Sequence, residues 1–176
     1  MPALTGPVLS AAALLVAAGA PKVGRPAAAT GALRSVGARV PAWAVRALGA
    51  GEAALGALVL VAGGRVATAL VAASYAGFTG FVALALRTGG AVSSCGCVGR
   101  ADTPPTRAHL VVTGALALLA AAAAATGQVR GLAVLLPAAP AETALTVALA
   151  GIGCWLAWLA LAELPRLRPA GTAART

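Results

Sequence analysis

Two cysteines separated by one glycine are the residues of this chain whose chemistry is easiest to name. Cys95 and Cys97 lie in a polar run, residues 93–100, that joins two long apolar segments. Residues two apart can approach disulfide distance where the chain turns, and Gly96 makes such a turn easy. A ring this small would be strained and easily reduced, as in catalytic rather than structural disulfides. The pair therefore predicts thiol/disulfide exchange, with Cys95 and Cys97 as the catalytic residues.

Two other interpretations of the pair stay open at this point. Soft thiolates suit Cu(I) or Zn(II), and His109 follows on the same side of the membrane as a further potential ligand. A fourth ligand is missing, so the sequence specifies no complete metal site. The cysteines could also be two unreactive loop residues. Nearby arginines would favour the reactive thiolate if they are close; they are Arg87, Arg100 and Arg107.

Glu52 is an acidic residue inside an otherwise apolar run. A charge at the centre of a helix in lipid costs roughly 3 kcal/mol on insertion scales, so such an acid is a candidate functional residue. We expect Glu52 to be neutral or paired, with Lys22 or Arg46 as its partner and Tyr75 as a hydrogen-bond donor. A purely structural role in helix packing and a role in proton or quinone handling are both open.

The third cysteine, Cys154, lies near the middle of the last apolar segment. We interpret Cys154 as a small buried apolar residue rather than a third redox thiol. Trp155 and Trp158 beside it are expected to make ordinary packing or lipid contacts.

The elements that carry these residues must lie in a bilayer, because hydrophobic residues make up 60% of the 176, charged residues 10%, and mean hydropathy is +0.93. We predict an all-α, polytopic membrane helical bundle with about five transmembrane helices, a four-helix core plus one. One transmembrane domain would cover residues 1–165, and residues 166–176 would form a basic, disordered tail. The predicted spans are 1–21, 47–64, 66–86, 110–129 and 143–162.

Several details of these segments carry their own predictions. The first segment could be a signal peptide, but it lacks a positively charged start and is long enough to span. Residues 131–141 are too short to span and contain two prolines, so they are expected to form a loop or a dip into the interface. Small residues at helix contact spacing occur at Gly49/Ala53/Ala57 and Ala73/Gly77. Asp102 or Thr103 is expected to cap the helix that begins near Pro104 and Pro105.

The net charge of +9 is explained by the flanks of the spans, so no nucleic-acid partner is needed. The connection 21–41 is basic and contains no acid, which suits either a short helix on anionic lipid headgroups or a solvated loop. With five spans, this connection, the cysteine segment and the C-terminal tail share the side that carries most arginines. The positive-inside rule would place the cysteines on the cytoplasmic side.

Three short motifs coincide with a known family. The chain resembles MauE, the methylamine-utilisation protein of the MauE/DoxX group of redox-associated membrane proteins. The resemblance extends over residues 8–163 and depends on the runs Ala-Gly-Ala-Pro-Lys at 18–22, Glu-Ala-Ala-Leu-Gly at 52–56 and Ser-Cys-Gly-Cys-Val-Gly at 94–99. Relatives often carry Phe at the position of Val98, which is a mild departure.

The resemblance implies a multi-pass protein of a bacterial-type plasma membrane that takes part in forming disulfides, in the context of methylamine metabolism. Its partner would be a thioredoxin-like protein or an exported cysteine-containing substrate. Cys95 and Cys97 would be the redox pair, with Lys22 and Glu52 as the matching polar, cofactor-binding positions. By analogy alone with other membrane oxidases, electrons could pass to a quinone near Glu52. Disulfide formation in exported proteins would place the cysteines outside, against the arginine count.

The first hypothesis is thus a membrane thiol/disulfide oxidoreductase or its electron-transfer subunit. The alternative is a non-enzymatic metal-handling or assembly module that binds copper or zinc through the same cysteines. A third hypothesis, a small transporter, depends on Glu52 alone.

Overall fold

The computed structural model describes residues 4–87, 105–127 and 129–163, and these residues are almost entirely helical. The order is α1 (Thr5–Gly24), α2 (Ala27–Ser35), α3 (Ala42–Val61), α4 (Arg65–Arg87), α5 (Arg107–Thr126), α6 (Leu132–Ala138) and α7 (Pro140–Trp158), which continues as a π-helical turn over Leu159–Glu163. Five of these helices are long and apolar enough to cross a membrane. The predicted helical bundle with five spans is therefore confirmed.

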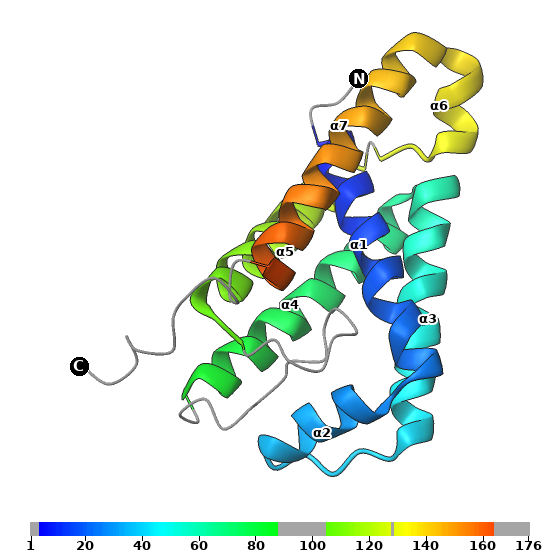
Figure 1. Cartoon of the computed structure of the whole chain (residues 1–176). Helices are drawn as coiled ribbons and strands as arrows, with labels where there is room; N and C mark the ends of the chain where they lie inside the picture. Colours follow the sequence, from blue (N-terminus) through cyan, green and yellow to red (C-terminus); the bar gives the residue numbers. More distant parts are fainter. Residues whose placement is uncertain (1–3, 88–104, 128, 164–176) are drawn as a thin grey trace.

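The spans run up and down with α1 in the middle of the bundle (Figure 1). The helices α1, α3, α4 and α5 form a core of four, in which α1 packs against α3 and α5 and α4 packs against α5. The helix α7 lies outside this core and packs mainly against α1. It is also the least buried of the five spans.

Glycine makes the α1–α3 contact possible. A Cβ atom on Gly19 would lie 2.5 Å from the carbonyl oxygen of Gly49, and one on Gly56 would lie 2.5 Å from that of Ala12. The two backbones therefore touch, which is how small residues hold helices together in lipid. Gly49 was predicted for this role, and so was Ala53, whose backbone nitrogen lies 2.8 Å from the Cβ position of Gly19. The other predicted positions do not take part. Ala57 is exposed, and a Cβ on Gly77 would have no neighbour within 4 Å.

Side-chain hydrogen bonds add a second set of links between the spans. The Tyr75 hydroxyl of α4 donates to the carbonyl oxygen of Ala11 in α1 at 2.7 Å. The Ser10 hydroxyl of α1 donates to the carbonyl oxygen of Ala150 in α7 at 2.9 Å. Such bonds are each worth about 1 kcal/mol in a membrane. The sequence had suggested Glu52 as the acceptor for Tyr75. The structure shows that Tyr75 donates to the backbone of α1 instead.

The structure decides between the alternatives for the connections and changes one predicted boundary. Of the two possibilities for the basic connection between α1 and α3, a short helix or a loop, the structure has a helix, α2, which packs on the end of α4 through Ala32 and Ala85. The segment expected to be a loop, residues 131–141, includes the short helix α6. The N-cap of α5 is Thr106, so the predicted caps Asp102 and Thr103, which lie outside the described residues, precede the true helix start.

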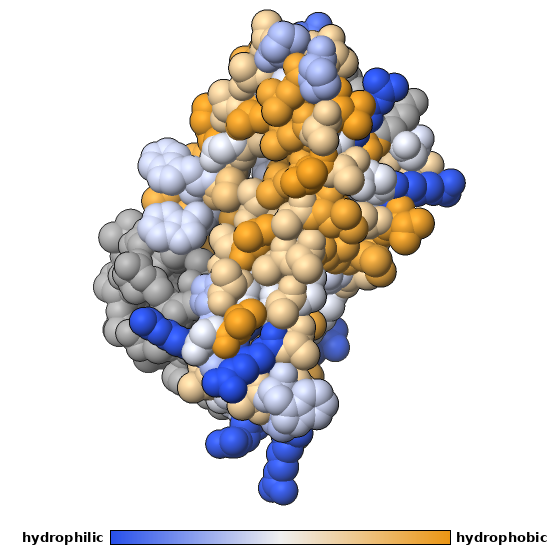
Figure 2. Space-filling model, turned by 90° about the vertical axis from the view of Figure 1, so that its right-hand side faces the viewer, coloured by the Kyte–Doolittle hydropathy of each residue, from blue (hydrophilic) through white to orange (hydrophobic). Residues whose placement is uncertain are grey.

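The surface matches a membrane setting. Figure 2 shows an apolar band across the middle of the molecule and a group of hydrophilic side chains at the lower end, with a smaller group at the upper right. The lower end in Figure 1 is where α2 lies. The end of the bundle that carries α2 therefore also carries most of the charge.

Candidate functional site

Within the described bundle, a buried lysine and a buried glutamate on two different spans form an ion pair. The Lys22 Nζ of α1 donates a hydrogen bond to the Glu52 Oε2 of α3 at 2.5 Å. The two side chains are only 6% and 5% exposed. Among the described residues this is the only ion pair.

The fold brings the two charges together through the glycine contact described above. Gly49, one turn before Glu52, lies against the Cβ of Lys22, and Gly19 lies against the Cβ of Glu52. The close backbone approach therefore sets the two long side chains beside each other. Glu52 is ten residues after the first residue of α3, which is about 15 Å along the helix axis. Lys22 lies in the last turn of α1, so the pair joins the α2 end of α1 to a position further along α3.

An aromatic ring covers the ammonium group. The Lys22 Nζ lies 4.5 Å from the centroid of the Phe78 ring of α4, a cation–π distance. A lysine ammonium has three hydrogens to donate. One is used on Glu52, and among the described residues no other acceptor for Lys22 is found. Arg46, the other cation considered from the sequence, is exposed and does not contact Glu52.

The pair forms part of the wall of a cavity. The cavity has a volume of about 300 Å³ and lies between α1, α2, α3 and α4. Apart from the ion pair, its wall is almost entirely apolar and includes Phe78, Phe81 and Leu33. A volume of this size is at the lower end of the range for small-molecule sites. We call this space the Lys–Glu cavity.

The Lys–Glu cavity opens sideways between α3 and α4. Leu48 of α3 and Ala73 and Gly77 of α4 line the cavity and are also exposed on the outside of the bundle. In a bilayer, exposed apolar side chains of membrane-spanning helices face lipid. A molecule dissolved in the membrane could therefore enter the cavity without crossing the aqueous phase.

The redox pair predicted from the sequence, Cys95 and Cys97, lies outside the described residues. The structure does place the two helices that the cysteine segment connects. Arg87 at the end of α4 and Arg107 at the start of α5 are both exposed, and α4 and α5 pack along each other. The α2 helix packs on the same end of α4.

His109, considered as a metal ligand or an interfacial polar residue, is buried at the start of α5. It is 1% exposed, and its Nδ1 accepts from the Thr106 backbone N–H at 3.3 Å as part of the cap of α5. Its Nε2 is buried without a partner among the described residues. In that part of the chain, no group of three His, Cys, Asp or Glu residues could hold a metal ion.

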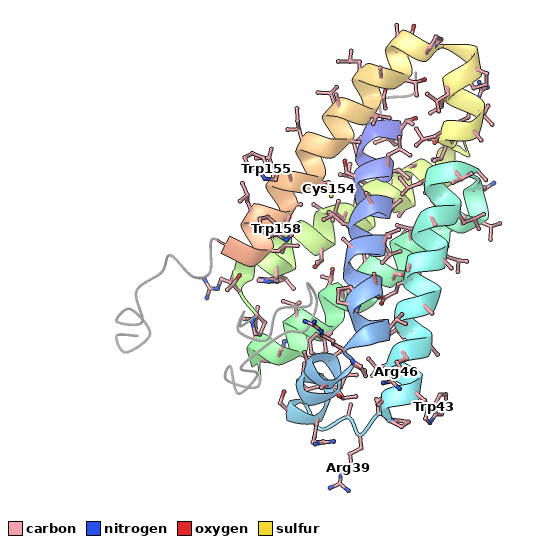
Figure 3. The ribbon with its side chains drawn as sticks, turned by 45° about the vertical axis from the view of Figure 1, so that its right-hand side comes forward. Arg39, Trp43, Arg46, Cys154, Trp155 and Trp158 are labelled. Carbon is pink, nitrogen blue, oxygen red and sulfur yellow. The ribbon has the colours of Figure 1, made fainter. Side chains whose placement is uncertain are left out.

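Cys154 is half-buried on the side of α7 that faces α1, and Trp155 points away from the bundle (Figure 3). Cys154 packs against the apolar core cluster around α1. This agrees with its interpretation as a small packing residue. The cavity itself was missed by sequence reasoning, because its lining comes from four helices and only Lys22 and Glu52 give a signal in the sequence.

These observations define a multi-pass helical membrane protein with a buried Lys–Glu pair in a lipid-accessible cavity. The chain belongs to the family described as methylamine utilisation protein MauE, whose model matches residues 2–127. The match covers α1 to α5 and ends before α6 and α7, so it is shorter than the resemblance drawn from the motifs. No curated protein and no solved structure matches the chain.

Proposed function

We propose that this protein takes part in thiol/disulfide exchange at the membrane through Cys95 and Cys97. The observation that carries the proposal is the Cys-Gly-Cys run within a chain of the MauE family. A two-residue separation favours a strained, reducible disulfide, which suits exchange better than structural cross-linking. The matched range includes both cysteines and the Lys22–Glu52 pair.

The exchange would proceed in two balanced steps. A thiolate of a thioredoxin-like partner or of a cysteine-containing substrate attacks Cys95 of the Cys95–Cys97 disulfide, and Cys97 leaves as a thiolate. A second thiolate of the partner then attacks the mixed disulfide and releases Cys95. The partner gains a disulfide, and the Cys95/Cys97 pair takes up the two electrons.

Trapping tests this proposal. In a Cys97→Ala variant the Cys95–Cys97 disulfide cannot form, but the Cys95 thiolate can still attack the disulfide of an oxidised partner, which is the reverse of the second step. The mixed disulfide then lacks the Cys97 thiolate that would release the reduced partner, so a covalent adduct should accumulate. The adduct is detected by non-reducing electrophoresis and identified by mass spectrometry. A Cys154→Ala variant is the matched control and should trap nothing, because Cys154 is a packing residue of α7.

The metal-handling alternative gives the opposite result in the same experiment. If neither Cys95→Ala nor Cys97→Ala traps a partner and the purified protein carries one equivalent of copper or zinc, the exchange proposal is wrong. Metal content is measured by elemental analysis of the wild-type protein and of the Cys95→Ser/Cys97→Ser variant.

A further inference from the structure

We propose that the Lys–Glu cavity binds the ring of a membrane quinone, with a ring carbonyl oxygen accepting a hydrogen bond from the Lys22 Nζ. The site itself is inferred from the cavity and its ion pair. The choice of a quinone rests in addition on the proposed exchange function, which needs a membrane-soluble acceptor of two electrons.

The charge of the cavity selects a neutral hydrogen-bond acceptor. Glu52 neutralises the Lys22 ammonium, so an anionic headgroup such as a phosphate would gain little from Lys22 and would be repelled by Glu52. A neutral carbonyl oxygen can use a remaining lysine hydrogen without disturbing the pair. A hydrogen bond from a charged donor in an apolar wall is stronger than one between neutral groups.

The shape and position of the cavity favour a flat ring with an apolar tail. Phe78 and Phe81 offer aromatic surface for a ring, and the volume of about 300 Å³ would hold a headgroup but not a long chain. The opening between Leu48, Ala73 and Gly77 would let an isoprenoid tail extend into lipid. The ester carbonyl groups of phospholipids are also neutral acceptors, but they have no flat ring to lie against Phe78 and Phe81.

A quinone also completes the chemistry of the cysteine pair. Reoxidation of the two thiols to a disulfide releases two electrons and two protons, and a quinone takes up both to become a quinol. Glu52 and Lys22 both line the cavity, so they lie where they could exchange a proton with the bound ring.

Binding is tested with the full chain in phosphatidylcholine nanodiscs and decylubiquinone as the probe. We expect saturable binding that weakens by about tenfold or more in Gly77→Leu, since a side chain at Gly77 fills the cavity. Gly80→Leu is the matched control. Gly80 is on the same helix, has no neighbour within 4 Å of its Cβ position and does not line the cavity, so binding should stay within about twofold.

The hydrogen bond is tested separately. The Lys22→Met/Glu52→Gln double variant removes both charges at similar volume, and it should bind decylubiquinone about tenfold more weakly than the wild type does. Decylbenzene lacks ring oxygens, so the double variant and the wild type should bind it equally well. Equal binding of the two probes to the wild type, or equal losses in Gly77→Leu and Gly80→Leu, would overturn the proposal and indicate a space filled by lipid chains. A photoreactive azidoquinone should label peptides of α1, α3 or α4, and labelling confined to other helices would also overturn it.

The quinone site and the exchange function can fail independently. A Cys95→Ser/Cys97→Ser variant should keep full decylubiquinone binding and lose mixed-disulfide formation. Trapping without quinone binding would refute only the site proposed for the Lys–Glu cavity. Quinone binding without trapping would refute only the exchange function.

Discussion

At the scale of single residues, Lys22 and Glu52 depend on each other. Each charge would be costly alone in a span, and the pairing at 2.5 Å with Phe78 over the ammonium offsets that cost. A buried pair of this kind is weak evidence for stability, because two apolar residues often pack equally well. Its position at the wall of the Lys–Glu cavity agrees with the binding role that we propose for it.

Removing one member of the pair should destabilise the protein more than removing both. We expect Lys22→Met or Glu52→Gln alone to cost about 3–5 kcal/mol of unfolding free energy, because the remaining group is left buried without its partner. The double variant should recover most of that loss. Unfolding by a denaturing detergent, followed by circular dichroism, measures the three values, and Arg46→Gln on the exposed face of α3 is the control. Simply additive single effects would mean that the two side chains are not coupled.

At the scale of helices, the α1–α3 contact depends on the missing side chains of a few glycines. Gly56→Ala would place a Cβ 2.5 Å from the Ala12 carbonyl oxygen, which forces the helices apart. We expect a loss of about 1–3 kcal/mol, typical of overpacking. Gly51→Ala on the same helix is the matched control, since nothing lies within 4 Å of its Cβ position and alanine favours the helix. Melting temperatures in detergent compare the two, and equal changes would contradict the contact.

The sequence was enough to predict the five spans, because each is a run of apolar residues of membrane length. It was not enough to predict the contacts between them. Alanine and glycine occur on every face of these helices, so spacing alone does not identify the contact. Ala57 had the right spacing but is exposed, and Gly77 has no neighbour within 4 Å of its Cβ position, whereas Gly56 and Gly19 make the contact. The Lys22–Glu52 pairing was predictable because a charge within a span is costly unless it is paired, and Lys22 is a cation at the end of the neighbouring span. The cavity was not, because it depends on how α2 closes the space between α1 and α4.

At the scale of the whole molecule, exposed arginines are concentrated at one end. Arg39 and Arg46 extend from this end beside Trp43, which is 71% exposed (Figure 3). Exposed tryptophan and arginine are typical of the boundary between lipid and water. The other exposed arginines at this end are Arg25, Arg34, Arg87 and Arg107, and those at the opposite end are Arg65 and Arg130. The charge asymmetry predicted from the sequence is therefore present in the fold.

Five spans place the two ends of the bundle on opposite sides of the membrane, and this topology can be measured in intact cells. Ser35→Cys on exposed α2 and Thr126→Cys at the end of α5 are the reporters, each made in a chain whose native cysteines are replaced by serine or alanine. A membrane-impermeant thiol reagent should label only one of them before the cells are opened. In the wild type, Cys95 and Cys97 should label from the same side as Ser35→Cys, after reduction if they form a disulfide. Labelling of both reporters from one side would contradict the five-span topology.

The same experiment assigns the side of the membrane. Labelling of the α2 end from outside would contradict the positive-inside expectation and agree with a role in oxidising exported proteins. Labelling from inside would assign the exchange chemistry to the cytoplasmic side.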